Sequence, residues 1–239
     1  MLNALRAYDY HPAFSSVLMD HWRRFDAASM RAELTELRRA HPDASAVRIT
    51  HSYDAYLRAP GRYLCTFEDM LSICDALQLR VISCLFNRWH DAKLDCGGVY
   101  LEYLIPGLSW AYKEGFFAPY LADICQTHAQ DARICLWETC NKPYGAYRDF
   151  SGEIIENHLY EKRWLREMYC FVKQTGTAIP IAISAQDWFG PAELAEMADC
   201  CDVLLRSPYY MNPERSRAVR AAQWPSAPAP VADILDVSY

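Results

Sequence analysis

The feature that most constrains the fold is a regular alternation of short β-like runs with segments of helical periodicity. Strands that alternate strictly with helices form a parallel sheet covered by those helices. The third run, LRVISCLF, is nearly all apolar, as expected for a strand buried on both faces. The sequence therefore predicts an α/β fold of the (β/α)-barrel, or TIM-barrel, type. The expected strands are 5–10, 45–50, 79–86, 133–137, 178–184 and 202–206, and the expected helices are 25–41, 66–78, 119–130, 161–176, 191–200 and 212–223.

Local signals support the helix boundaries. Asp26 precedes the first helix as an N-cap, with Met30 and Leu34 at helical spacing behind it. Thr66 is expected to open the second helix, because acidic residues follow it in the first turn. Gly176 follows the fourth helix and suits the left-handed position at a helix C-terminus.

The number of units falls short of a complete barrel. Six β–α units occupy about 223 of the 239 residues, where an eightfold barrel would need two more. We therefore expect an incomplete barrel domain over 1–223 and a Pro/Ala-rich tail over 224–239, which offers one weak strand, PVADILDV, as a remnant of strand seven. An early end to the sheet predicts an open seam, against which the tail lies or the chain associates with itself.

Composition narrows the function. A net charge of −6 argues against a nucleic-acid-binding face, which would be basic. No apolar run approaches the length of a membrane span, and no leader peptide is visible at the start, so a cytoplasmic protein is expected. The ten cysteines contain no CxxC pair and lie scattered through predicted strands and helices. Neither a metal site nor a cofactor is predicted from them.

The ends of the predicted strands carry polar and aromatic motifs in a fixed order. They read YDYHPA, AVRIT, VISCLFNRWHD, LWETCNKP, ISAQDW and CDVLLRSPYY. In this order the motifs resemble those of the clan A glycoside hydrolases of the cellulase and mannanase type. These enzymes are (β/α)₈ barrels that act on β-linked glucans and mannans. The resemblance covers roughly residues 5–210, and it implies an oligosaccharide or polysaccharide ligand and no cofactor.

The resemblance also assigns roles, and the chain departs from them at three positions. LWETCNKP takes the place of a Trp-Asp-x-x-Asn-Glu-Pro signature, so Asn141 fills the sugar-binding asparagine position. Lys142 then stands where the acid/base glutamate belongs, and Ser207 replaces a histidine of the sixth strand. No nucleophile is identified: Leu235 falls at that position in the best register, with Asp236 one residue away.

Other residues are candidates for the wall of the same cleft. Arg48 corresponds to an arginine that lies beneath the catalytic carboxylates in the family, although a structural ion pair is an equal alternative. The remaining substrate-binding candidates are His11, Trp89, His90, Trp188 and Tyr209. A histidine in a turn and aromatic rings in the core are their structural alternatives. Glu138 could act as a surrogate acid, but its family counterpart has only a supporting role.

Three functions remain open. The first is a glycoside hydrolase, impaired here because a lysine with an ordinary pKa near 10.4 is a poor proton donor at neutral pH. Retaining enzymes also need two carboxyl groups roughly 5 Å apart. The second is a relative without activity that keeps a carbohydrate-binding cleft. The third is an enzyme in which Lys142 forms a Schiff base. If the chain is active, Asp91, Asp187 and Asp236 are the first carboxylates to test.

Overall fold

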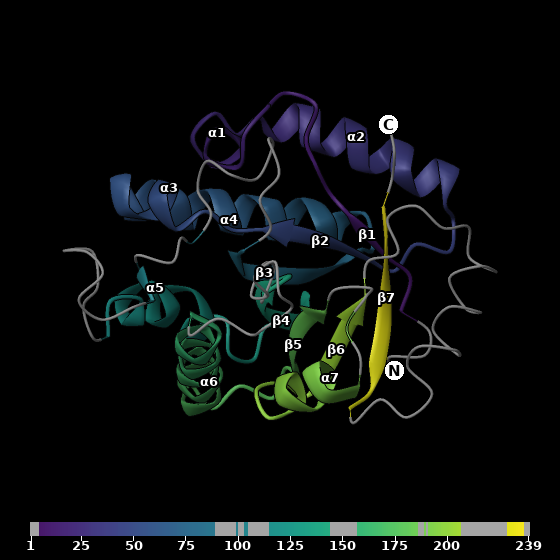
Figure 1. Cartoon of the computed structure of the whole chain (residues 1–239). Helices are drawn as coiled ribbons and strands as arrows, with labels where there is room; N and C mark the ends of the chain where they lie inside the picture. Colours follow the sequence, from purple (N-terminus) through teal and green to yellow (C-terminus); the bar gives the residue numbers. More distant parts are fainter. Residues whose placement is uncertain are drawn as a thin grey trace.

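The structure is a computed structural model, and it describes residues 5–88, 99, 103–104, 115–143, 157–185, 189, 191–206 and 229–236. Parallel strands form the centre of the molecule and helices lie outside them (Figure 1). The strands are β1 (Ala7–Asp9), β2 (Ala46–Thr50), β3 (Arg80–Asn87), β4 (Ile134–Asn141), β5 (Ile181–Ala185), β6 (Val203–Arg206) and β7 (Val231–Asp236). The helices are α1 (Leu18–Arg23), α2 (Ala27–Ala40), α3 (Tyr53–Arg58), α4 (Pro60–Ala76), α5 (Ala118–Leu121) with a π-helical turn at Ala122–Gln126, α6 (Asn157–Gln174) and α7 (Pro191–Ala198). The predicted fold class, a parallel barrel with outer helices, is confirmed.

The tail lies against the edges of the sheet, as expected, but it closes the barrel, so the expected open seam is wrong. β7 pairs in parallel with β6 on one side, Leu204 beside Val231, and with β1 on the other, Ala7 beside Ile234. A seventh strand in the segment PVADILDV thus supplies hydrogen-bonding partners to both edges that six strands would leave unpaired. Self-association at an open seam therefore loses its structural basis.

Most helices begin and end where the sequence indicates. The Asp26 side chain accepts hydrogen bonds from the backbone nitrogens of Ala28 and Ser29, at 2.9 and 3.1 Å, and so caps α2. Gly176, with φ of 74°, takes the left-handed position after α6. Of the predicted helices, 212–223 lies outside the described residues.

The start of α4 was predicted wrongly. The helix begins at Pro60, six residues before Thr66, which lies buried inside it. Proline is well suited to the first turn of a helix, because its missing N–H has no intrahelical acceptor there. The acidic turn after Thr66 belongs to the middle of α4. Two short helices, α1 and α3, were not predicted, since each has only six residues.

The barrel interior changes character along its axis. Toward the amino ends of the strands, the interior is a small apolar cluster that includes Ala7, Ala46, Ala182 and Leu205. Two residues further along β1 and β2, the paired positions are Asp9 and Arg48. Side chains two apart on a strand share a face, so the interior becomes charged toward the carboxyl ends of the strands.

A buried histidine joins the outer helices to the barrel. His51, just after β2, shares hydrogen bonds with the Tyr63 hydroxyl at 2.7 Å and the Ser83 hydroxyl at 2.8 Å. Its ring stacks on Trp22, with centroids 4.8 Å apart. Burial lowers the pKa of His51 to about 3, so the imidazole is neutral at physiological pH. We therefore assign His51 a structural role.

We expect the fold to depend on β7. A chain shortened after Ala229 should lose at least about 3 kcal/mol of unfolding free energy, because several backbone hydrogen bonds worth about 1 kcal/mol each are removed from two edges. Urea unfolding measures this loss, and size-exclusion chromatography measures association at the bared edges. A chain ending after Asp236 is the control and should behave as the full chain. Equal stability of the two would contradict the role of β7 in closure.

Candidate functional site

A buried guanidinium lies at the centre of the polar half of the barrel. Arg48 is fully buried, and its Nε and Nη2 donate to the two carboxylate oxygens of Glu138 on β4 at 2.6 and 2.8 Å. Its Nη1 donates to Oδ2 of Asp9 on β1 at 3.0 Å. Bidentate arginine–carboxylate pairs are among the strongest hydrogen-bonded pairs in proteins. Arg48 therefore links three strands across the barrel interior.

Glu138 is held from a second direction. The Ser184 hydroxyl of β5 donates to Oε1, the same oxygen that accepts from Nη2 of Arg48. The carboxylate is fully buried, and both of its oxygens are occupied. A general acid must reach the leaving-group oxygen of a substrate. Glu138 therefore acts as a structural carboxylate, and the surrogate-acid interpretation has no support in this geometry.

The charges in this cluster determine how Asp9 titrates. Burial alone would raise the pKa of Asp9, but the charge of Arg48 and the nearby His11 outweigh burial and hold this pKa well below its usual range. His11 lies just after β1, partly exposed, with Nε2 3.4 Å from Oδ2 of Asp9. His11 thus borders the cluster from its open side.

Asn141 and Lys142 stand at the carboxyl end of β4. The Asn141 amide nitrogen donates to Oδ1 of Asn87 on β3 at 2.7 Å. Its other amide atom, Oδ1, is buried and has no hydrogen-bond partner among the described residues. Lys142 is 5% exposed, with φ of 47°. This left-handed conformation is uncommon for residues other than glycine and often marks functional sites.

A second buried ion pair involves Arg88, the residue directly after β3. Arg88 donates from Nε to Oε1 of Glu161 on α6 at 3.0 Å and from Nη1 to the carbonyl of Val99 at 2.5 Å. Its backbone nitrogen donates to the carbonyl of Asn141 at 3.0 Å. Arg88 therefore joins the ends of β3 and β4 to the first turns of α6 and to the segment that contains Val99.

The structure describes only part of the predicted site. Arg48, Asn141 and Lys142 lie at or near the carboxyl ends of the strands, and His11 lies beside Asp9 at the same end. Trp89, His90, Trp188, Ser207 and Tyr209 lie outside the described residues, as do Asp91 and Asp187. Of the two positions considered for the nucleophile, Asp236 pairs with Asp9 in the register of β7 and β1, and Leu235 pairs with Tyr8.

Sequence reasoning missed four polar residues of this region: Asp9, Asn87, Arg88 and Ser184. The sequence did contain a signal for Asp9. Asp9, Arg48 and Glu138 are ionisable residues inside apolar strands, where a charge requires a partner of opposite sign. Asn87 and Ser184 carry no such signal, because uncharged polar residues are common near strand ends.

No protein-family profile and no curated protein matches the sequence. Solved structures do match its fold. An exo-beta-1,4-mannosidase from Opitutaceae bacterium strain TAV5 superposes with a TM-score of 0.63 at 16% identity, over 86% of this chain and 38% of that one. The GH5_18 protein from Streptomyces cattleya, solved in complex with GlcNAc, superposes with a TM-score of 0.60 at 14% identity. The match covers 89% of this chain and 53% of the Streptomyces protein. A glycoside hydrolase family 5 mannosidase from Rhizomucor miehei superposes with a TM-score of 0.58 at 15% identity. The match covers 95% of this chain and 67% of the Rhizomucor protein.

These structures have the fold implied by the strand-end motifs. The chain spans only 53% and 38% of the lengths of the Streptomyces and Opitutaceae proteins, so it corresponds to part of each. None of the helices in the described ranges has the length and apolar character needed to cross a bilayer.

We expect Asp9→Asn to destabilise the protein in a pH-dependent way. At pH 7 the loss of one charged hydrogen bond to Arg48 should cost about 1.5–3 kcal/mol of unfolding free energy. Because the native pKa of Asp9 is lowered, its stabilisation is complete above the unfolded pKa near 3.9 and declines as pH falls below it. Urea unfolding between pH 7 and 3 should show the difference in unfolding free energy between wild type and Asp9→Asn becoming smaller as the pH approaches 3.

Asp43→Asn is the control for this experiment. Asp43 pairs with Arg6 at 3.6 Å on the surface, with both side chains more than half exposed. Its replacement should change the unfolding free energy by less than about 0.5 kcal/mol at any pH. A difference between Asp9→Asn and wild type that stays constant down to pH 3 would contradict the ion-pair account.

Proposed function

We propose that the protein is a glycoside-hydrolase-like barrel that binds a β-linked oligosaccharide of the mannan or glucan type and has lost most or all of its hydrolytic activity. The observation that carries this proposal is the pair Asn141-Lys142 at the end of β4. Asn141 keeps a buried amide oxygen available at the sugar-binding position. Lys142 stands where an acid/base carboxylate would be required.

The chemistry of hydrolysis supports loss of activity. A retaining mechanism needs one carboxyl group that donates a proton and a second that attacks the anomeric carbon. An ordinary lysine donates poorly at neutral pH, and its deprotonated form cannot act as a carboxylate base toward water in the second step. Glu138, the buried carboxylate nearest in sequence, is occupied by Arg48 and Ser184.

The ligand class follows from the fold comparisons and the remaining polar groups. Two of the compared proteins are mannosidases, and a third was solved with GlcNAc. Asn141 and His11 are candidate contacts for sugar hydroxyls. Arg48 would support the site from below, since its described contacts go to protein groups. Trp89, His90, Trp188, Ser207 and Tyr209 remain proposed wall residues on the strength of the motifs alone.

We expect no measurable hydrolysis of an activated aryl β-mannoside or β-glucoside by the wild type. Activity should be undetectable beside that of a family 5 mannosidase, because no carboxylate is identified that could attack the anomeric carbon, and this step is required even when the leaving group is activated. Lys142→Glu should not restore the rate, because no nucleophile is supplied by that change. The release of nitrophenol from a nitrophenyl glycoside measures both proteins, and such a leaving group needs little help from an acid.

Robust turnover by either protein would contradict the proposal and would mean that an unassigned carboxylate attacks the sugar. Asp236→Asn is then the first variant to make, because Asp236 stands level with Asp9 in the barrel register. Asp43→Asn, in the surface pair with Arg6 near the amino ends of β1 and β2, is the matched control. Binding of β-1,4-mannotriose without turnover, weakened by Asn141→Ala, is the outcome that the proposal predicts.

A Schiff-base enzyme is the second candidate, favoured by the burial of Lys142. Desolvated lysines lose their proton more readily and become nucleophiles. Borohydride reduction in the presence of small aldehydes and ketones, followed by peptide mass spectrometry, tests this candidate. We expect Lys142 to be trapped no faster than Lys173, which is partly exposed on α6. Preferential trapping of Lys142 would favour the Schiff-base enzyme over the glycosidase relative.

A further inference from the structure

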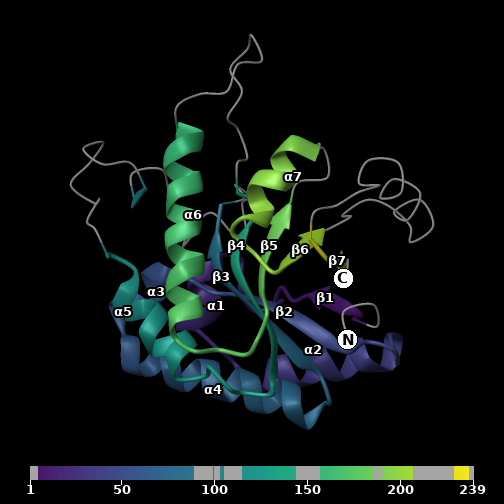
Figure 2. The same ribbon diagram turned by 90° about the horizontal axis from the view of Figure 1, so that it is seen from below.

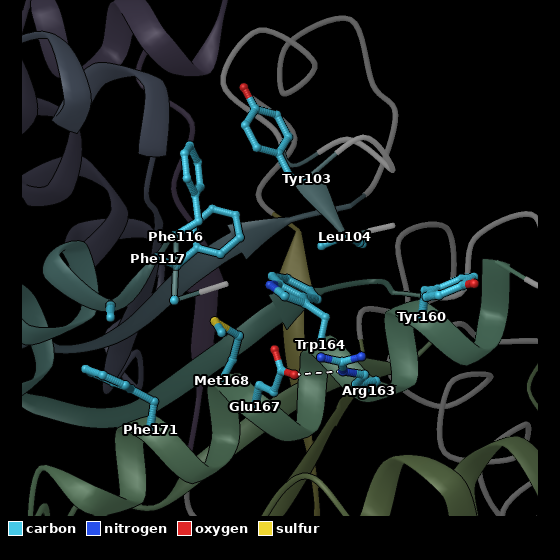
Figure 3. A pocket seen from close by; sticks show the side chains of 12 residues that line it. Tyr103, Leu104, Phe116, Phe117, Tyr160, Arg163, Trp164, Glu167, Met168 and Phe171 are labelled. Atoms are coloured by element: carbon cyan, nitrogen blue, oxygen red, sulfur yellow. Dashed lines mark hydrogen bonds and ion pairs between the residues drawn. The ribbon is translucent and has the colours of Figure 1, made fainter. Parts of the chain in front are cut away.

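An aromatic cavity lies outside the barrel, along the side of α6. It has a volume of about 250 Å³, and Figure 3 shows the side chains that surround it. Its apolar walls include Tyr103, Phe116, Phe117, Trp164, Met168 and Phe171. It lies on a helix flank and contains none of the strand-end residues of the candidate site. We refer to it as the α6 pocket.

The pocket arises from unequal neighbouring helices. α6 has 18 residues, whereas α5 has four and continues only into a five-residue π-helical turn. In Figure 2, α6 extends well beyond α5. The inward stripe of α6, which includes Leu165 and Val172, is buried in the core. An adjacent stripe at helical spacing, Tyr160, Trp164 and Phe171, therefore faces a region that α5 is too short to cover.

Trp164 gives this pocket an unused hydrogen-bond donor. Its side chain is 4% exposed, and its indole nitrogen has no hydrogen-bond partner within the described parts of the chain. In Figure 3 the ring lies among pocket-lining side chains, with its nitrogen toward Phe117 and Met168. The Trp164 and Phe117 ring centroids are 6.0 Å apart, and an aromatic face accepts an N–H only weakly. Buried tryptophan N–H groups usually have an acceptor, so an oxygen atom in the pocket would be stabilised.

The mouth of the pocket is polar on one side. Arg163 donates from Nε to Oε1 of Glu167 at 2.9 Å, and both side chains are about half exposed. This pair offers a carboxylate acceptor and guanidinium donors next to the aromatic walls. A ligand that fits both the aromatic walls and the Arg163–Glu167 pair needs an apolar ring face and several hydroxyl groups at its edge.

We propose that the α6 pocket binds a single pyranose ring, as a free sugar or as a terminal unit of a glycan. A pyranose has C–H faces that pack on aromatic rings, and its oxygens can accept from the Trp164 N–H and bond with Arg163 and Glu167. The volume suits one ring, being below the 300–1,000 Å³ of pockets for larger ligands. A plain aromatic molecule would leave the charged pair unused. This site is independent of the barrel cleft and of the proposed function.

The test is titration of ¹⁵N-labelled protein with methyl β-D-mannopyranoside, observed at the tryptophan indole N–H resonances. The chain has seven tryptophans, and the resonance absent from Trp164→Phe identifies Trp164. We expect this resonance to shift with a Kd on the order of 1 mM, since a single sugar ring makes few contacts and binds weakly.

Two variants and one control make the test specific. Trp164→Phe keeps a ring but removes the donor and should weaken binding about 2- to 10-fold, as measured by saturation-transfer NMR. Glu167→Gln, at the half-exposed mouth, should weaken it about 2- to 5-fold without affecting folding. Tyr169→Phe, on the same helix but not lining the pocket, should leave the Kd unchanged.

Three outcomes would overturn the proposal. These are no shift of the Trp164 resonance at 50 mM sugar, equal binding by Glu167→Gln, and binding of phenol but not of the pyranoside. Asn141→Ala separates this site from the barrel cleft. It should leave the Trp164 titration unchanged whether or not the cleft binds an oligosaccharide.

Discussion

The arrangement of the barrel depends on one buried guanidinium. Arg48 contacts Glu138 through two donors and Asp9 through a third, which ties together β1, β2 and β4. Burial of three ionised groups is costly unless each is fully compensated. Removing Arg48 would leave both carboxylates without their cationic partner, and removing Glu138 would take away the bidentate partner of Arg48. The polar half of the interior is therefore strongly constrained by charge, whereas the other half is an apolar cluster of alanine, valine, leucine and isoleucine side chains.

This constraint has a consequence for function. In a working glycosidase of this fold type, carboxylates at the strand ends must be available to the sugar. Here the buried carboxylates Asp9 and Glu138 are committed to Arg48, and the residue after Asn141 is a lysine. In the proposed function, the barrel framework is retained and Lys142 stands in place of the proton donor. Among the residues that the structure describes, seven strands close the barrel, with β7 between β6 and β1.

Much of the fold was predictable from the sequence because strands and helices alternate with the expected periods. The cap at Asp26 and the glycine after α6 are local signals that were read correctly. The start of α4 was misplaced, because an acidic turn after Thr66 resembles a helix N-terminus even in the middle of a helix. The strand PVADILDV and its position against the edge of the sheet were expected, but the closure was missed, since it depends on the pairing of β7 with both β6 and β1.

The candidate site was predictable only in part. Asn141, Lys142 and Arg48 followed from the motifs, but the partners of Arg48 depend on contacts between residues 39 and 90 positions apart. Such contacts exist only once the barrel is closed. The roles of Glu138 as a structural carboxylate and of Arg88 as a link to α6 therefore required the structure.

The central claim is that the barrel binds a β-linked sugar without cleaving it, while Glu138 stays bound to Arg48. A crystal structure of the wild-type protein soaked with β-1,4-mannotriose tests this most directly. The account predicts an intact trisaccharide at the carboxyl ends of the strands, in contact with the Asn141 amide, and an unbroken Arg48–Glu138 pair. Cleaved sugar in the barrel, or a Glu138 carboxylate turned away from Arg48 toward the glycosidic oxygen, would contradict it.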